Sequence, residues 1–322
     1  MSHTPRPHLP APSDNDNDAQ PSKGRPEAHR RAGVIDSFLK SPFAGIAPWA
    51  LLSILSGPGR FEEAVVAALG FSLLVMVAGV IRGIKVHTLE VFGALFFAAL
   101  AVVGLVATDN VIRWLELWSG ELTNISLAGF AWLTLLIRKP FTMAYAKDTT
   151  PQEYWDSPLF ERINAVITAV WAGAFMFAAA VGFVGDYVFH DPSNFWTGWI
   201  LQLAAIFFAA AVTEFYPDYA SAKFDLANGE PARLPSTIGL VEWLPTFVVV
   251  TGIAGLVTDS VDFAVGMALI VIGSVASGLM VKLFAADKKP CREPMPLVHN
   301  GTRARAARHR LIRKRLMRTS RR

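Results

Sequence analysis

Long apolar runs recur along most of this chain, and they restrict its fold more than any other feature. Two clear examples, 64–81 and 88–107, contain almost no charged residues. A helix of about 20 residues crosses the hydrocarbon core of a bilayer, which is about 30 Å thick. Only 17% of the residues are charged, against about 25% in soluble proteins, and a soluble core would have to hide several such runs. The sequence therefore predicts an all-α fold, a polytopic bundle of transmembrane helices.

Eight segments are apolar enough to be predicted as spans. The first is short, because a helix over 43–56 rises only about 21 Å. It either crosses with help from its flanks or enters the membrane as a re-entrant segment. The predicted segments are 43–56, 64–81, 88–107, 122–137, 163–185, 196–213, 238–257 and 263–284.

The distribution of basic residues predicts how these spans are oriented. Arg82 and Lys85 follow the second segment, Arg138 and Lys139 follow the fourth, and basic residues recur in every second connection. Cytosolic loops of membrane proteins carry an excess of Lys and Arg. Both termini are therefore predicted to be cytosolic and the number of crossings to be even. This favours eight spans over the seven that a re-entrant first segment would leave.

The two ends of the chain differ in composition from its apolar middle. Residues 1–40 are polar and rich in Pro, Asp and Ser, so we expect a disordered cytosolic tail, and they lack the apolar core of a secretory signal peptide. The transmembrane helical domain is predicted over 41–286. A basic cytosolic tail is predicted over 287–322.

The C-terminal tail has the strongest charge of the chain. Apolar residues such as Leu311 and Ile312 interrupt its basic residues at spacings that a helix can gather on one side. A basic amphipathic helix beside the inner leaflet is expected to bind anionic lipid. Nucleic-acid binding is the less favoured alternative, and a plain topology signal is a third. The candidate lipid-binding residues are Arg308, Arg310, Arg313, Lys314 and Arg315.

Few residues inside the predicted spans carry ionisable or strongly polar side chains. The candidates are Glu121, Asn124 and Glu242, and Glu242 precedes Pro245 by three residues. Ionisable groups in spans are usually functional, and a proline after a carboxylate can mark a broken helix. These residues keep a small-solute transporter or channel open as an alternative function. The single cysteine, Cys291, excludes a Cys-cluster metal site, and no catalytic motif is visible, so no cofactor, metal site or enzymatic activity is expected.

The longest polar passage between apolar segments runs over 138–171. Its residues 145–160 are a candidate surface for docking a partner protein. The alternative is a plain connection, with Arg138 and Lys139 as a topology signal, Pro140 as a helix stop and Asn164 as an interhelical hydrogen bond. The candidate docking residues are Arg138, Lys139, Pro140, Tyr154, Trp155 and Asn164.

Glycine and alanine are frequent in the later spans. Gly252, Gly266 and Gly273 are examples, and small residues let helices approach closely in lipid. We expect most of them to serve packing inside one bundle, although a homo-oligomer face would have the same composition.

Several short motifs follow one another in the first two thirds of the chain: a span ending in Arg82 and Lys85, the outer turn 109–114, Arg138-Lys139-Pro140, then Trp155, Asn164 and Trp171-Ala172. Their order resembles the bacterial intracellular septation protein A family over roughly 41–223. The resemblance implies a multi-pass protein of the bacterial inner membrane, tied to envelope synthesis or division. It implies a non-enzymatic role through contacts with other membrane proteins. The resemblance gives the leading functional hypothesis, and transport is its alternative.

Overall fold

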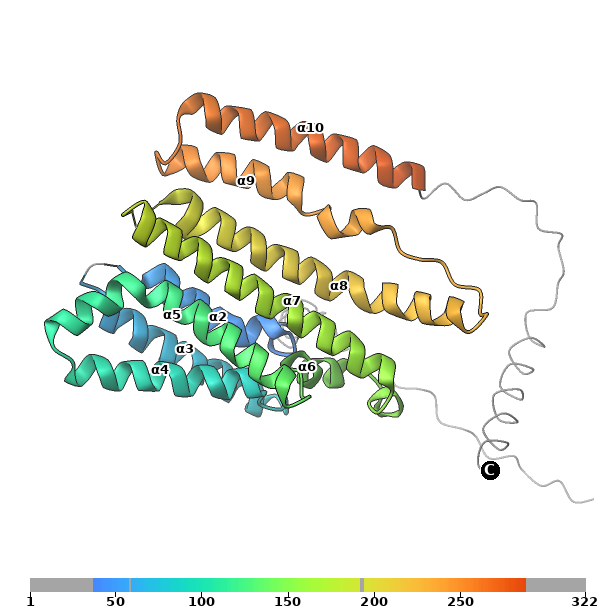
Figure 1. Ribbon diagram of the computed structural model, residues 1–322, viewed down its shortest axis with the longest axis horizontal. Coiled ribbons are helices and arrows are strands. Elements are labelled where there is room, and N and C mark those ends of the chain that lie inside the picture. Colours follow the sequence, from blue (N-terminus) through green and yellow to red (C-terminus); the bar gives the residue numbers. More distant parts are fainter. Residues whose placement is uncertain (1–36, 58, 192–193, 288–322) are drawn as a thin grey trace, which may run out of the picture. The chain divides into compact units, whose positions relative to one another are not determined.

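All secondary structure in the described part of the chain is helical. The computed structural model describes residues 37–57, 59–191 and 194–287 (Figure 1), and these divide into two units at Ser274 and Val275, inside the last helix. Three predictions concern residues outside the described part of the chain: those for the N-terminal tail before residue 37, for Cys291 and for the basic residues within 308–315. The elements are α2 (Pro42–Leu55), α3 (Phe61–Ile81), α4 (Thr88–Val106), α5 (Asp109–Leu136), α6 (Phe141–Thr149), η1 (Gln152–Tyr154), α7 (Pro158–Phe183), η2 (Val184–Val188), η3 (Phe195–Ile200), α8 (Leu201–Ala227), η4 (Thr237–Val241), α9 (Leu244–Val257) and α10 (Phe263–Asp287).

The lengths and compositions of these helices are those of a multi-pass membrane protein. Six stretches of the described chain are long and apolar enough to cross a bilayer: Phe61–Ile81, Thr88–Val106, Pro158–Val188, Phe195–Ala227, Thr237–Val257 and Phe263–Lys282. Helices α5 and α6 pass the same test only together, and they are bent by 75° at their junction. Helix α2 is shorter, with 14 residues. The predicted total of eight requires both α2 and the α5–α6 pair to cross, so the number of spans stays a prediction, as does the orientation of the termini.

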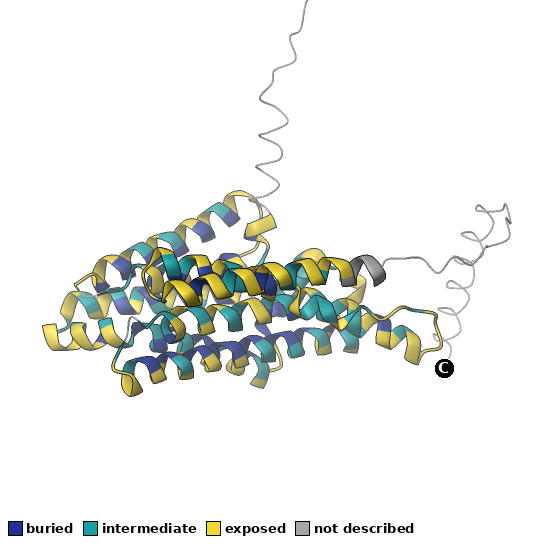
Figure 2. Cartoon of the chain, turned by 90° about the horizontal axis from the view of Figure 1, so that it is seen from above, coloured by how far each residue is buried: buried dark blue, intermediate teal, exposed yellow. Residues whose placement is uncertain are grey.

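Many large apolar side chains lie on the surface of the described helices. Large side chains such as Leu105 and Val257 are 86% and 81% exposed, and Figure 2 shows exposed residues along the outward faces of the helices. In water, such extended apolar surface would drive aggregation. Lipid tails are as apolar as these side chains, so the same surface is stable inside a bilayer.

Aromatic residues fill the interior of the N-terminal helices. Trp49 of α2 is 1% exposed and stacks on Phe96 of α4, with 4.7 Å between ring centroids. Helix α2 contacts both α3 and α4. The short first segment, α2, is therefore a core helix of the N-terminal group α2–α4, because it buries its large side chains between two longer helices.

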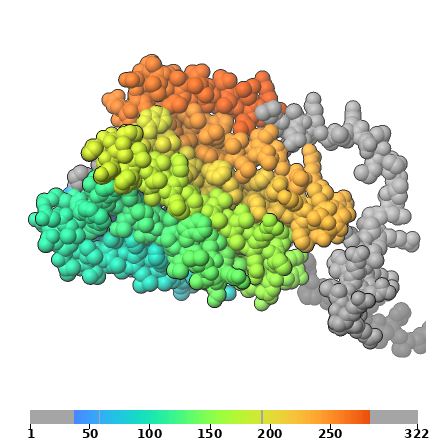
Figure 3. All heavy atoms as spheres, in the orientation of Figure 1, coloured from blue at the N-terminus to red at the C-terminus, as the bar shows by residue number. Residues whose placement is uncertain are grey.

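Helix α7 joins the N-terminal helices to α8. It makes its main contacts with α5 on one side and with α8 on the other. In Figure 3 the atoms of α7 adjoin those of α5 and α8 on the face in view. Trp171 of α7 is 1% exposed, and its Nε1 donates to Thr213 Oγ1 of α8 at 3.0 Å. This buried indole uses its only N–H across the helix contact.

Two predicted boundaries were wrong, each where polar residues continue a helix. Helix α5 begins at Asp109, not at residue 122, because its inward face includes Leu115 and Ser119 on successive turns. Helix α8 continues to Ala227, through Pro217, although the sequence predicted a loop over 215–236. In both helices the polar residues lie on a helical face that the mean hydropathy of the segment conceals.

The polar passage over 138–171 is also largely helical. Helix α5 ends where Arg138 adopts the left-handed conformation, with φ of 56°, and the N–H of Lys139 bonds to Thr134 O at 2.9 Å. This closure turns the chain sharply and lets α6 begin at Phe141. Phe141 and Thr142 of α6 are buried, so the first part of the passage belongs to the interior.

Glycines bring α9 and the first turns of α10 into close contact. A Cβ on Gly252 would lie 2.8 Å from the backbone oxygen of Gly266, and one on Gly273 would lie 2.7 Å from Pro245 O. Backbone atoms cannot move aside as the end of a flexible side chain can. The predicted packing role of these small residues is therefore present in the structure.

Substitution of Gly252 by alanine should destabilise the protein by about 1–3 kcal/mol, the usual effect of overpacking. The added methyl group would press on the backbone of Gly266, and α9 would have to move away from α10. The matched control is Gly70→Ala in α3, where an added Cβ meets nothing within 4 Å. Thermal unfolding in detergent measures both variants. Equal melting temperatures for Gly252→Ala and Gly70→Ala would contradict the close contact.

Candidate functional site

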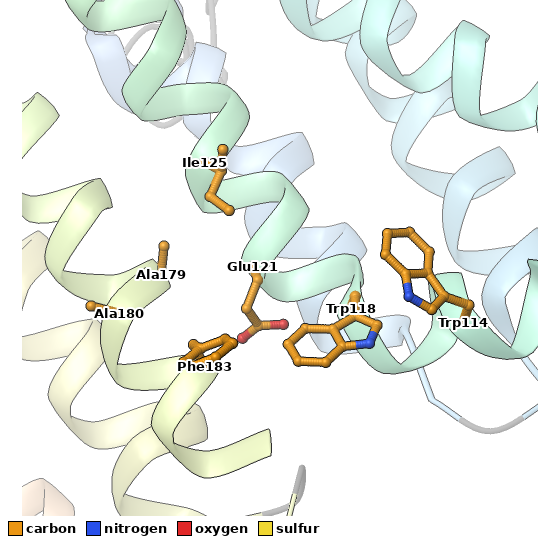
Figure 4. Close-up of a pocket in the computed structure, with 7 residues that line it drawn as sticks. All are labelled: Trp114, Trp118, Glu121, Ile125, Ala179, Ala180 and Phe183. Atoms are coloured by element: carbon orange, nitrogen blue, oxygen red, sulfur yellow. The ribbon is translucent and has the colours of Figure 1, made fainter. Parts of the chain in front are cut away.

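A buried carboxyl group lies inside the helical bundle, where α5 faces α7. Glu121 of α5 is only 7% exposed, and its carboxyl group interacts with that of Asp186 in η2. In Figure 4 the Glu121 side chain points from α5 toward α7, with its carboxyl group between the rings of Trp118 and Phe183. An ionisable group in this position is costly unless it is partnered, and such groups usually mark a functional path.

Side-chain amides extend this polar site toward α8. Asn124, one turn after Glu121, donates from Nδ2 to Gln202 Oε1 at 3.1 Å. Gln202 in turn donates from Nε2 to the backbone oxygen of Thr197 at 2.9 Å. These bonds connect α5 to α8 and to η3, which directly precedes α8, so two parts of the chain that are distant in the sequence share one polar network.

Two glycines of the α7–η2 segment make room for these polar groups. A Cβ at Gly182 would collide with Glu121 Oε1 and would lie 3.1 Å from Gln202 Nε2. A Cβ at Gly185 would collide in the same way with Thr197 Oγ1. Only glycine therefore lets these polar side chains pack directly on the backbone of this segment.

The backbone around the site is π-helical in two places. Val184–Val188 carries Asp186, and Phe195–Ile200 carries Thr197. The second segment is capped by Asn194, whose Oδ1 accepts from the N–H groups of Trp196 and Thr197, both at 3.1 Å. π-Helical turns are rare and occur frequently at functional sites. Here they carry Asp186 and the Thr197 backbone oxygen that accepts from Gln202.

An open groove of about 540 Å³ adjoins Glu121. Its walls are formed by α5 and α7, and the rings of Trp118 and Phe183 are 5.9 Å apart (Figure 4). Trp114, Ile125 and Phe183 are 46–59% exposed, so the groove opens at the periphery of the bundle. Glu121 is the single ionisable residue in a lining that otherwise consists of Trp114, Trp118, Ile125, Ala179, Ala180 and Phe183.

A second polar cluster ties α6 to the start of α4. His87 is 4% exposed, and its Nδ1 and Nε2 lie 3.1 Å from Glu90 Oε1 and 2.8 Å from Asp148 Oδ2. Glu90 also accepts from the backbone N–H of His87 at 3.2 Å, which closes a capping box on α4. Tyr145 stacks on the imidazole, with 4.0 Å between ring centroids. Burial alone would lower the pKa of His87, but bonds to the two carboxylates raise it above its usual 6.5.

The structure separates the predicted docking residues into buried and exposed groups. Arg138, Lys139 and Tyr154 are exposed, whereas Pro140 is buried. Trp155 is half-buried: its Nε1 donates to Thr150 O at 2.9 Å, and the amine of Lys147 lies 5.1 Å from its ring centroid. Tyr154 is thus the aromatic side chain that η1 leaves accessible, while Trp155 holds the connection together.

Asn164 does not make the interhelical side-chain bond that the alternative of a plain connection assigned to it. Its Nδ2 donates to Phe160 O of the same helix at 2.9 Å. The contact between α6 and α7 is made by the hydroxyl of Thr142, which lies 3.0 Å from the backbone oxygen of Asn164 and 2.8 Å from Thr168 Oγ1. The residue is buried, as an internal position requires, but its backbone makes the bond to the neighbouring helix.

Of the three predicted intramembrane residues, the structure brings Glu121 and Asn124 together. Glu242 is exposed at the end of η4 and has no place in the network. Sequence reasoning missed that Asp186 and Gly182 meet Glu121 and that Gln202 meets Asn124, since spacing along the chain carries no sign of these contacts. It also missed the His87 cluster, for which the His87-to-Glu90 spacing of a capping box was a readable signal.

Neither metal ligation nor similarity to known proteins adds a further assignment. Within residues 37–57, 59–191 and 194–287, no three His, Cys, Asp or Glu side chains are placed to hold a metal ion. No family model, curated protein or solved structure matches the chain. The site is therefore interpreted from its own chemistry.

The raised pKa of His87 makes the stability of the protein depend on pH. Its contribution is fully present below pH 6.5 and is lost as the pH rises through the raised value in the folded state. The melting temperature of the wild type in detergent should therefore fall more between pH 6 and pH 9 than that of His87→Gln. The exposed His190→Gln variant serves as the control and should follow the wild type. Parallel curves for wild type and His87→Gln would refute this role.

Proposed function

We propose that this multi-pass membrane protein moves a small solute across the bilayer by way of the Glu121 site. The observation that carries the proposal is the burial of Glu121 between α5 and α7, beside a second carboxyl group, Asp186. Carboxyl groups inside spans face cavities and pathways, because lipid does not solvate them. Helix packing alone does not require a carboxyl group at this buried position, whereas transport of a solute would use one.

The irregular backbone near Glu121 supports the same proposal. Non-helical or broken backbone at membrane depth is tolerated where it is buried in protein or lines a cavity. In transporters, such breaks supply carbonyl groups at the binding site. The π-helical segments Val184–Val188 and Phe195–Ile200 depart from regular α-helical hydrogen bonding beside Glu121, and the Gln202 amide donates to the backbone oxygen of Thr197.

Replacement of Glu121 by glutamine should reduce transport by about tenfold or more, because it removes the ionisable group while preserving shape. Proteoliposomes that enclose a pH-sensitive dye would be exposed to a panel of monovalent cations and organic amines, and the internal pH would be followed. The wild type should respond to at least one solute, and Glu121→Gln should respond to it much less.

The matched control for this experiment is Glu242→Gln. Glu242 is an exposed carboxylate near the start of α9, outside the network, and its replacement should leave the flux unchanged. Equal flux through the wild type and Glu121→Gln would refute the role of Glu121. A wild type that responds to no solute in the panel would count against transport.

The resemblance to the intracellular septation protein A family supports a second candidate function. In this proposal the chain is a non-enzymatic inner-membrane protein with eight spans and cytosolic termini, and it acts in envelope synthesis or division through other membrane proteins. Its basic tail would add contacts to anionic lipid. The specific observation in favour is Tyr154, which is 53% exposed in η1 within the motif-bearing connection.

Replacement of Tyr154 by alanine should then reduce the recovery of partner proteins at least severalfold. An exposed aromatic residue is a typical anchor of an interface, whereas its loss does not affect the bonds of Trp155. Affinity purification from membranes, followed by identification of division and elongation proteins, measures the effect. Tyr187→Ala is the control, because Tyr187 is 62% exposed in η2, at the other end of α7. If both variants recover the same partners as the wild type, η1 is only a connection.

A further inference from the structure

We propose that the groove beside Glu121 binds hydrophobic organic cations, such as tertiary or quaternary amines and phosphonium ions with apolar substituents. This inference names the substrate class of the transport site and so rests on the proposed function. It comes from three properties of the groove: its apolar walls, its aromatic faces and its one carboxyl group.

The walls of the groove select an apolar ligand. Ile125 and Ala179 lie on its two sides (Figure 4), and Glu121 is the single polar member of its lining. A volume of about 540 Å³ lies within the usual range of ligand pockets, about 300–1,000 Å³. A strongly hydrated solute would lose its water on entry and find few polar atoms in return.

The electrostatics of the groove select a positive charge. In the described part of the chain, the side-chain partner of Glu121 is the acidic Asp186, and neither Lys nor Arg lies in the groove lining. The rings of Trp118 and Phe183 flank the carboxyl group (Figure 4). Aromatic faces attract cations, most strongly where water is excluded. A cation in the groove would thus meet both the Glu121–Asp186 carboxyl pair and aromatic rings.

Two other occupants fit these observations less well. A metal ion requires several ligands, and among the described residues no three His, Cys, Asp or Glu side chains are placed to hold one. A neutral lipid chain would fill the apolar walls without using Glu121, whose 7% exposure places it at the inner side of the groove. A hydrophobic cation uses both the walls and the carboxyl group.

The position of the groove also fits a ligand that arrives from the bilayer. Trp114 is 53% exposed and Ile125 59%, and both belong to the lining. Hydrophobic cations partition into membranes before they bind proteins, because their substituents are apolar. An opening at the periphery of the bundle admits such a ligand without a path through the bundle ends.

The binding of radiolabelled tetraphenylphosphonium to the purified full-length protein in detergent tests this inference. We expect saturable binding by the wild type. Binding should be weakened about tenfold or more in Glu121→Gln, because this variant keeps the cation–aromatic contacts but loses the attraction between the cation and the carboxyl group. Tetraphenylborate has the same shape and the opposite charge, and it should compete poorly. Equal competition by the anion would show an apolar groove without preference for cations and would overturn the proposal.

Two further variants keep the test decisive if Glu121→Gln folds poorly. Ile125→Trp fills the groove from an exposed position and should abolish binding. Gly182→Ala displaces the Glu121 carboxyl group without removing it, whereas Gly173→Ala, on the same helix with nothing within 4 Å, is its control. Wild-type affinity in both Ile125→Trp and Gly182→Ala would exclude this groove as the site.

The binding and flux measurements separate this inference from the proposed function. Tetraphenylphosphonium binding that depends on Glu121, without flux of any solute, would support a cation site and overturn transport. Glu121-dependent flux without tetraphenylphosphonium binding would support transport and overturn the hydrophobic-cation class.

Discussion

The contact of the Glu121 carboxyl group with the backbone of Gly182 is the interaction on which the centre of this bundle depends. A side chain at position 182 would occupy the space of Glu121 Oε1, so the glycine decides that α5 and α7 can meet around a carboxyl group. The same contact sets the place of the groove, because the lining residues Trp118 and Phe183 lie beside Glu121 on α5 and beside Gly182 on α7. The Asn124–Gln202 bond then adds α8 to the pair. One position without a side chain thus fixes how three helices share a polar centre.

The bilayer explains why most of the helices could be predicted from the sequence. Apolar side chains must continue over about 20 residues to cross it, and this requirement left clear signals at Phe61–Ile81 and Thr88–Val106. The signal failed where a helix is amphipathic. The first turns of α5 bury Leu115 and Ser119 but expose charged residues, so mean hydropathy placed its start too late. Helix α6 was also missed, because it is not apolar enough to stand out in the sequence and its burial depends on contacts with α7.

The candidate site was predictable only in its local part. Glu121 and Asn124 lie one turn apart on α5, and their polarity within a span was visible in the sequence. Their partners Gln202 and Asp186 lie far along the chain, and only the packing of α5 on α7 and α8 brings them near. Glu242 had the same sequence signal as Glu121, yet it is exposed. Polarity in an apolar segment therefore indicates a candidate, and the neighbouring helices decide whether it becomes a site.

The two polar clusters act on the same bent pair of helices. Glu121 lies in α5, and Asp148 lies in α6, which follows α5 after the turn at Arg138. The bond between His87 and Asp148 holds α6 to the start of α4, while the Asn124–Gln202 bond holds α5 to α8. A movement of α5 that opened its contact with α7 would strain one of these bonds or bend the junction further. Both bonds could stay intact during such a movement only if the 75° angle between α5 and α6 changed, because neither cluster holds the junction.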